Sequence, residues 1–390
     1  MFSIRDDVFN TMEDRDLSLE TAASILEIHV NSLYNFKKSG SIGFRSLLKL
    51  AQLLYGKDYH DKMREWCLLL PSTEAIKHAF EYAAIKRDTD LLEDLLENAE
   101  GDVSLQDYSS VYGLIYGYMT DAFPYTELKN KVSAVKIKKD KDLTVLLEIY
   151  GCYALYFDKD FLNILEKSKG IRKNIEALKG DRKLFFKECY LFRVSEILMP
   201  VNLHFSNYEE ARYFAEIIFF ADISSKSKAD ASYVIGMSYL NVNREECLKN
   251  LALSLDLIQT IGNAQLTREA ETTLNIAKMI FDAKDGCLNA DPLELASELR
   301  LGRDSDFIRY FEFRMADDIG KLYEGFSFFI ERMNFLFAEL IADDLGIFGV
   351  DARQVNALKS IKIIKKGDVS FEKSLISCFS CGDRYDYACI

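Results

Sequence analysis

The scarcity of proline is the feature that most constrains the fold. Only four prolines occur in 390 residues: Pro71, Pro124, Pro200 and Pro292. Because proline interrupts helices, and because few stretches alternate between polar and apolar residues, this pattern favours long helices over a turn-rich β fold. With 49% hydrophobic and 28% charged residues, the composition is that of a globular protein. We therefore predict an all-α chain, long enough for two or more domains.

The N-terminal segment does not look like an export signal. MFSIRDDVFNTMEDRD carries acids where a signal peptide needs a basic start followed by an apolar run. No other stretch approaches the roughly 18 uncharged apolar residues of a membrane-spanning helix. Eight cysteines are scattered through helical patterns, which is typical of buried thiols in a reducing compartment. We expect a cytoplasmic protein that has no membrane partner.

Three cysteines, Cys378, Cys381 and Cys389, cluster in the tail. CFSC has the spacing of half a zinc or redox site. A zinc site needs four ligands, however, and all four histidines lie far away in the sequence. Ordinary thiols are therefore favoured, and no metal or other cofactor is predicted.

Charge is unevenly distributed along the chain. Residues 1–56 sum to −1, so the other 334 residues carry −12 of the total of −13. Within residues 28–56 there are four basic residues and no acid. A local positive patch on an acidic body suggests that this patch meets phosphate while the body repels it.

Residues 19–40 have the pattern of two short helices joined by a turn. Ser18 is a suitable N-cap for the first helix, and His29 can cap the second. In the second helix Leu33 and Phe36 share one face, and the polar residues Asn31, Asn35 and Lys38 lie on the opposite face. Asparagine can bond an adenine edge through two hydrogen bonds, and lysine reaches guanine or phosphate. This polar face therefore suits a DNA major groove.

A third helix, from about residue 44 to 54, is expected to support this pair. The three together read as a helix-turn-helix unit in which Arg45 and Lys49 are exposed toward the DNA backbone. The predicted DNA-contact residues are Asn31, Ser32, Asn35, Lys37, Lys38, Arg45 and Lys49. The alternative is that the pair simply caps an array of helical repeats and has a hydrophilic outer face.

From Tyr59 onward the sequence reads as consecutive helices. Three segments share an apolar helix, a short turn with Asn or Asp, and a second helix that opens with acids: residues 111–132, 194–219 and 233–255. Ala211 and Cys247 occupy the same small-residue position, thirty-six residues apart. This period and the G-x-x-Y of GLIY and GMSY resemble degenerate tetratricopeptide-type repeats, which stack into an α-solenoid.

Such a solenoid has a concave surface on which polar side chains can hold an extended peptide. Asn202 has the amide needed to bond a peptide backbone, and Lys226 and Lys228 can bind a carboxylate. Asn275 and Asn334 interrupt strongly apolar helices and are either further clamps or satisfied core amides. For Asn202 and the lysines, the alternative is ordinary solvated surface.

The last hundred residues are unusually aromatic. They either close the repeat array or form a surface for self-association, and we favour a homodimer because helix-turn-helix proteins usually read paired half-sites. The predicted domains are residues 1–56 for DNA binding, 57–345 for peptide binding, and 346–390 for capping and dimerisation. The usual phosphate-binding, dinucleotide-binding and hydrolase motifs do not occur, so we expect no enzyme.

Two resemblances sharpen these expectations. The pattern A-x-x-L-x-I-x-x-x-S-L-Y-N-F, followed by FRSLLKLAQLL, resembles the helix-turn-helix of the phage Cro/repressor superfamily, with Glu27 where the turn usually has glycine. Residues 32–84 resemble the arbitrium receptor family, AimR, of temperate Bacillus phages. The second resemblance implies a dimeric transcription regulator of the lysis–lysogeny decision. Such a regulator binds operator DNA and releases it when a short secreted peptide fills the repeat groove.

By rough alignment, the same resemblance places Asn202 or His204, together with Lys226 and Asn334, near peptide-holding positions. Met237 stands where an amide is expected. Two other classes of protein remain open. A host quorum-sensing regulator of this architecture would be activated by its peptide, and a helical-repeat scaffold would not bind DNA at all.

Overall fold

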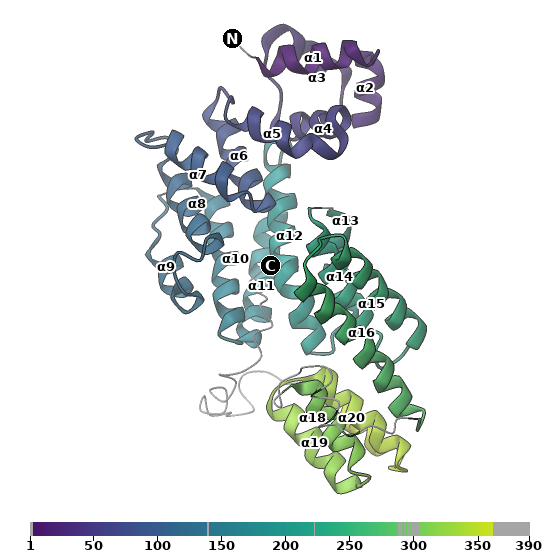
Figure 1. Cartoon of the computed structure of the whole chain (residues 1–390). Helices are drawn as coiled ribbons and strands as arrows, with labels where there is room; N and C mark the ends of the chain where they lie inside the picture. The colour runs from purple at the N-terminus through teal and green to yellow at the C-terminus, as the bar shows by residue number, and fades with distance from the viewer. Residues whose placement is uncertain are drawn as a thin grey trace. The chain divides into compact units, whose positions relative to one another are not determined.

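The chain is described by a computed structural model that covers residues 3–361, except 139, 222, 288–290, 292, 293, 295, 296 and 298–304. Every regular element in these ranges is helical, as Figure 1 shows. The all-α prediction is therefore confirmed. The chain divides into two compact units, Met1–Val194 and Ser195–Ile390, and the boundary falls inside helix α12 (Asp181–His204).

The first four helices of unit 1 pack together as a small head. They are α1 (Ile4–Asp14), α2 (Leu19–Leu26), α3 (Val30–Ser39) and α4 (Phe44–Tyr55). Ser18 Oγ accepts a hydrogen bond from the backbone N–H of Thr21, and His29 Nδ1 accepts one from that of Asn31. Both predicted caps are thus confirmed. Gly40 ends α3 with φ +72°, a conformation that glycine adopts without strain.

Helix α1 was not predicted, whereas Glu27 lies at the turn position where the sequence comparison placed it. The start of α1 follows ordinary rules, because Ser3 caps it, Asp6 and Asp7 lie in its first turn, and Val8 is buried. Helix α1 has only two buried residues, Val8 and Met12, so its amphipathic pattern is weak. Glu27 closes α2 with φ +53°, so a glutamate occupies the position that glycine usually fills.

The rest of unit 1 is a series of helical hairpins that leads to the first part of α12. The elements are η1 (Gly56–Asp58), α5 (Tyr59–Cys67), α6 (Thr73–Lys86), α7 (Thr89–Asn98), α8 (Gln106–Met119), η2 (Tyr125–Glu127), α9 (Leu128–Ala134), α10 (Lys141–Phe157) and α11 (Phe161–Glu176). The predicted breaks near Pro71, at residues 86–90 and at residues 121–124 are all present.

A buried ion pair ties four of these helices together. Arg193 Nε of α12 donates a hydrogen bond to Glu81 Oε1 of α6 at 3.0 Å, and the side chains are 6% and 0% exposed. Tyr112 of α8 donates to the other Glu81 oxygen at 2.7 Å, while Arg193 Nη1 donates to Tyr150 of α10 at 3.1 Å. Each charge is therefore compensated where water cannot reach it.

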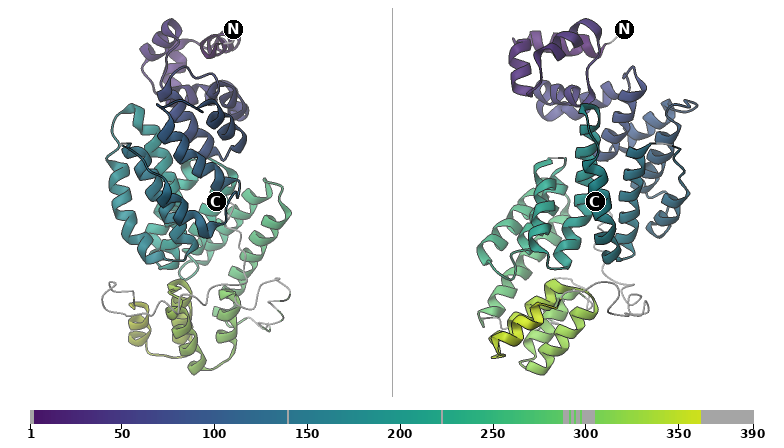
Figure 2. Two further views of the ribbon diagram at one scale, coloured as in Figure 1. Left: turned by 90° about the vertical axis from the view of Figure 1, so that its left-hand side faces the viewer. Right: turned by 180° about the vertical axis from the view of Figure 1, so that it is seen from behind.

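Unit 2 begins with the second part of α12 and continues through a row of neighbouring helices, which can be followed in the right-hand view of Figure 2. The row consists of α13 (Tyr208–Ala221), α14 (Ser225–Met237), α15 (Arg244–Gln259) and α16 (Ala264–Lys284). A second group follows: α18 (Asp306–Met315), α19 (Ile319–Glu331), α20 (Phe335–Ile347) and α21 (Ala352–Lys359). The predicted hairpins at 194–219 and 233–255 are present, and Ala211 and Cys247 are both fully buried.

Two glycines of the G-x-x-Y pattern have different structural roles. A Cβ added to Gly236 would lie 2.9 Å from Leu251 Cγ and 3.0 Å from the Cys247 carbonyl oxygen, because α14 and α15 cross closely there. A Cβ added to Gly113 of α8 would meet nothing within 4 Å. Only Gly236 is therefore required by packing.

Gly236→Ala is expected to destabilise the protein by about 1–3 kcal/mol, because the new methyl group forces α14 and α15 apart. Gly113→Ala is the matched control and should stabilise its helix by roughly 0.5–1 kcal/mol. Urea denaturation followed by circular dichroism measures both. Equal effects of the two substitutions would contradict this account of the crossing.

A buried carboxyl group joins α18 and α20 in unit 2. Asp344 is 0% exposed, and Arg314 Nε donates a hydrogen bond to its Oδ1 at 3.0 Å. Burial raises the pKa of Asp344 to about 6 from its ordinary value of 3.8, although Arg314 favours the charged form. The folded protein therefore binds this proton more tightly than the unfolded chain does. The resulting stabilisation is fully present below pH 3.8 and is lost as the pH rises through 6.

This shift predicts a pH-dependent difference between wild type and Asp344→Asn. Asparagine stays neutral, so the variant should gain about 1–1.5 kcal/mol of stability relative to wild type between pH 5 and pH 7.5. Urea denaturation of both proteins at the two pH values gives the difference. If the difference in free energy of unfolding between the two proteins were the same at pH 5 and pH 7.5, Asp344 would not titrate in this range.

Some expectations lie outside the described residues. The cysteine cluster Cys378, Cys381 and Cys389 belongs to this part of the sequence, as does most of the segment 346–390. The three-part domain division stays a prediction. Within residues that the structure places, no group of three or more metal-ligating side chains occurs. In the same residues, no helix combines the length and the apolar character needed to cross a bilayer.

Candidate functional site

The outer face of α3 carries the polar side chains expected there. Leu33 and Phe36 are 0% and 1% exposed and form part of the core of the head. Asn31 and Asn35 lie on the exposed side of the same helix. Of the other residues predicted on this helix, Ser32 is half-buried, whereas Lys37 and Lys38 are exposed. Asn31, Asn35 and Lys38 therefore share one accessible face of α3, whereas Lys37 Nζ lies over the Phe9 ring of α1 at 5.5 Å.

Tyr34 lies in the middle of this surface and was not predicted. It is three residues after Asn31 and four before Lys38, so the helical repeat places all three on one face. Tyr34 is 48% exposed, and its hydroxyl donates a hydrogen bond to Glu20 Oε1 at 2.7 Å. This bond lowers the pKa of Glu20. The spacing from Asn31 was the available signal, but an aromatic residue in an amphipathic helix is usually assigned to the core.

Arg45 and Lys49 of α4 are partly accessible to water, but neither projects freely, because each side chain has a partner within the protein. Both side chains are half-buried. Lys49 Nζ donates to the backbone oxygen of Leu26 at 2.8 Å, which satisfies a carbonyl at the end of α2. Arg45 is bound to Glu188 of α12. Both partners are distant in sequence, which is why the local pattern of α4 did not reveal them.

Unit 2 contains a cavity of about 170 Å³. It is formed by helices α12, α14, α15, α16 and α18. Its apolar lining includes Met199, Pro200, Val234, Ile258, Leu266, Ala270 and Phe307. An apolar cavity with a few polar groups is the usual form of a small-ligand site.

The polar lining of the cavity comes mainly from α14 and α16. Lys226 Nζ lies 2.7 Å from both carboxylate oxygens of Asp230, one helical turn away. Glu269 and Thr273 line the cavity from α16. A ligand in the cavity would therefore meet Lys226 with its charge already balanced by Asp230, and the carboxylate of Glu269. Lys226 is the only predicted peptide-binding residue that lines this cavity.

Asn202 has a different environment from the expected exposed face. It is buried, and its Nδ2 donates to the backbone oxygen of Leu198 at 2.8 Å. Its Oδ1 accepts a hydrogen bond from Asn207 Nδ2 at 3.3 Å. Both polar atoms of the amide therefore serve the end of α12 rather than a concave surface. The pattern that predicts the hairpin at 194–219 does not show which amides bond within its turn, so these contacts of Asn202 were missed.

The other predicted residues are dispersed. His204 is half-buried beside Phe205, Lys228 lies over the Phe219 ring at 5.7 Å, and Asn275 is exposed on α16. Asn334 does not interrupt a helix. It is buried at the break between α19 and α20, where its Oδ1 accepts from the N–H of Phe337 and its Nδ2 donates to Asp306 at 2.8 Å.

Comparisons with known proteins agree with this architecture. The family model described as "AimR transcriptional regulator-like" matches residues 60–301. No curated protein matches the chain. The matched range begins after the head, so the family match covers the repeats and does not include α1–α4.

Two solved structures resemble the chain. "Structure of SeMet-phAimR" covers 92% of this chain and 100% of its own, with 18% identity and a TM-score of 0.67. "Structure of phAimR-Ligand" covers 78% of this chain and 96% of its own, with 17% identity and a TM-score of 0.56. At such identities the likeness concerns the fold. Because the family model spans more than half of the sequence, the chain belongs to the AimR transcriptional regulator-like family.

Proposed function

We propose that this protein is a peptide-responsive transcription regulator that controls a phage lysis–lysogeny decision in the cytoplasm of the host cell. In this account the head binds operator DNA, and a short secreted peptide binds in the cavity of unit 2 and releases the DNA. Membership of the AimR-like family is the observation that carries the proposal. The protein acts by binding rather than by catalysis.

The exposed face of α3 supports the DNA-binding part. It offers two amides, Asn31 and Asn35, that can bond base edges, and two lysines that can reach phosphates. Arg45 and Lys49 remain in the proposed contact set, although both have partners within the protein. The segment 28–56 contains no acid of its own, which favours approach to a polyanion.

The cavity supports the peptide-binding part. A relative of the same fold has been solved with a ligand, "Structure of phAimR-Ligand". In the present chain the cavity combines apolar walls with the Lys226–Asp230 pair, a combination that suits the side chains and backbone of a short peptide. Lys226 is therefore the predicted residue best placed for contact. Asn202, His204, Lys228, Asn275 and Asn334 lie elsewhere in the fold.

A homodimer completes the proposal, because paired heads can read paired half-sites. Ile319 and Tyr323 lie one turn apart on α19 and are 41% and 38% exposed. We propose that this part of unit 2, with the segment 346–390, contributes to self-association. The repeats between residues 57 and 345 then form the peptide-binding domain, and residues 1–56 form the DNA-binding domain.

Replacing both Lys37 and Lys38 with glutamine tests the DNA-binding part. Each lost phosphate contact should reduce the slope of log K against log salt by about 0.9, so the double variant should lose up to about 1.8. Its affinity should fall by roughly tenfold or more at low salt. Lys37→Arg with Lys38→Arg keeps both charges and is the matched control. Equal slopes for all three proteins would contradict phosphate contacts at this surface.

A further inference from the structure

The first turn of α4 is one of the points at which the head contacts the helices that follow it in unit 1. Phe44 is buried at 5% exposure, and its ring centroid lies 5.1 Å from that of Phe185 on α12. On its other sides are the rings of His78 and Tyr82 of α6, at 5.6 and 5.9 Å. The start of α4 is therefore fixed beside α12 and α6.

The next residue, Arg45, makes a bidentate contact with a carboxylate. Its Nη2 donates to Glu188 Oε1 at 2.7 Å and its Nε donates to Glu188 Oε2 at 3.2 Å. The partners are 143 residues apart in sequence, and their side chains are 38% and 49% exposed. A guanidinium group binds a carboxylate and a phosphate through the same two-pronged geometry. Glu188 thus occupies the hydrogen-bonding groups that Arg45 would present to DNA.

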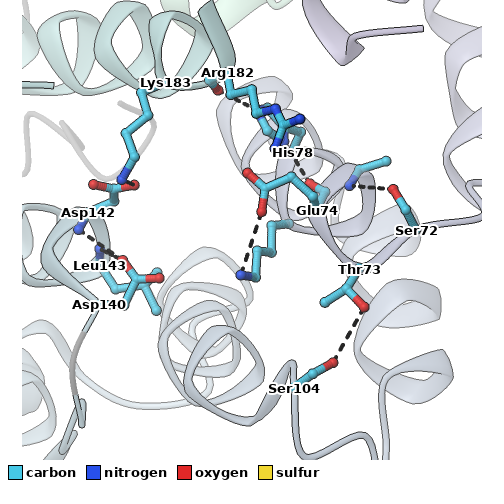
Figure 3. A network of polar contacts seen from close by, with 12 residues as sticks. Ser72, Thr73, Glu74, His78, Ser104, Asp140, Asp142, Leu143, Arg182 and Lys183 are labelled. Atoms are coloured by element: carbon cyan, nitrogen blue, oxygen red, sulfur yellow. Dashed lines mark hydrogen bonds and ion pairs between the residues drawn. The ribbon is translucent and has the colours of Figure 1, made fainter. Parts of the chain in front are cut away.

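The helix that carries Glu188 is anchored close to its start, as Figure 3 shows. Lys183 Nζ donates to Asp142 of α10 at 2.5 Å, and Asp142 is itself buried. His78 Nε2 lies 2.7 Å from the backbone oxygen of Arg182. Because these contacts hold the first turn of α12, Glu188 is presented to Arg45 from a supported helix rather than from a loop.

We propose that Glu188 is an internal substitute for DNA phosphate that holds Arg45 and thereby weakens DNA binding by the head. The segment 28–56 has four basic residues and no acid, and the fold supplies the missing acid from α12. Both side chains are accessible to water, so the pair is exchangeable: a phosphate can replace the carboxylate. The inference rests on the proposed DNA-binding function. It adds that Glu188 sets how tightly the head binds DNA.

The test uses the full-length protein and a fluorescein-labelled duplex of mixed sequence, with anisotropy measured from about 50 to 200 mM salt. Glu188→Gln should bind about 3- to 10-fold more tightly than wild type at the lowest salt. Its salt dependence should steepen by up to about 0.9, since one more phosphate contact forms. Arg45→Gln should bind no better than wild type, and the double variant Arg45→Gln/Glu188→Gln should match Arg45→Gln.

Glu176→Gln is the matched control, because it removes one exposed acid from α11 without releasing Arg45. Equal gains for Glu188→Gln and Glu176→Gln would overturn the inference, since they would reflect overall charge alone. A gain that persists in the double variant would also overturn it. If wild type binds the duplex and Glu188→Gln binds it with the same affinity, this inference is wrong, but the proposed DNA-binding function stands. If no variant binds even at the lowest salt, the proposed DNA-binding function fails with it. Thermal melting of each variant confirms that it is folded.

Discussion

Replacing Glu81 with alanine is expected to destabilise unit 1 by about 3–5 kcal/mol, because the substitution leaves the guanidinium of Arg193 buried without its counter-charge. Tyr112 would lose its hydrogen-bond acceptor at the same time. Trp66 is the only tryptophan and is 0% exposed in α5, so its fluorescence reports the unfolding of unit 1. Equilibrium urea denaturation followed at this residue gives the free energy of unfolding.

A paired replacement separates the loss of the ion pair from the loss of packing. Glu81→Leu together with Arg193→Met removes both charges and keeps apolar volume in the same place. It should therefore cost clearly less than Glu81→Ala, as buried ion pairs replaced by apolar side chains usually do. If the free energy of unfolding of Glu81→Ala lay within about 1 kcal/mol of that of wild type, the pair would not hold α6, α8, α10 and α12 together.

Filling the cavity of unit 2 is expected to abolish the response to peptide. Ala270 lines the cavity from α16, and Ala270→Phe would place a ring where the ligand is proposed to bind. Peptide affinity should fall by roughly 10- to 100-fold, a loss of about 1.4–2.8 kcal/mol. DNA binding without peptide should remain, because the head is untouched. Isothermal titration with a short peptide that binds the wild-type protein measures the loss.

Ala264→Phe is the control for this experiment. Ala264 is exposed at the start of the same helix and does not line the cavity. The added ring should therefore leave peptide affinity unchanged. If Ala270→Phe bound the peptide as tightly as wild type, the cavity would not be the peptide site.

The fold could be predicted where the physics is local. Helix caps such as Ser18 and His29 depend on side chains within three residues of the cap, and the buried face of α3 follows from its own spacing. The all-α class and the repeat hairpins follow from the same periodic pattern. The resemblance to AimR, drawn mainly from residues 32–84, agrees with a family match that extends to residue 301.

The site could be predicted only in part, because its remaining features depend on distant partners. The sequence predicts Arg45 as a DNA contact but not its partner Glu188, which lies on α12 and is connected to Arg45 by no local pattern. The amides of Asn202 and Asn334 bond within the protein, at the end and at the start of a helix, and for Asn334 this agrees with the alternative of a satisfied core amide. The cavity lining is indistinguishable in sequence from ordinary core, because its walls are mostly apolar.

The most direct test of the account measures the affinity of the full-length protein for its operator DNA, with and without saturating peptide. The operator can be isolated by selecting bound genomic fragments, and the peptide by screening short synthetic peptides for binding to the wild-type protein. Since a ligand shifts an equilibrium only by its differential affinity for the two states, the account predicts at least a tenfold loss of DNA affinity when peptide is bound. Unchanged affinity would contradict the account, and tighter binding would identify a peptide-activated regulator instead.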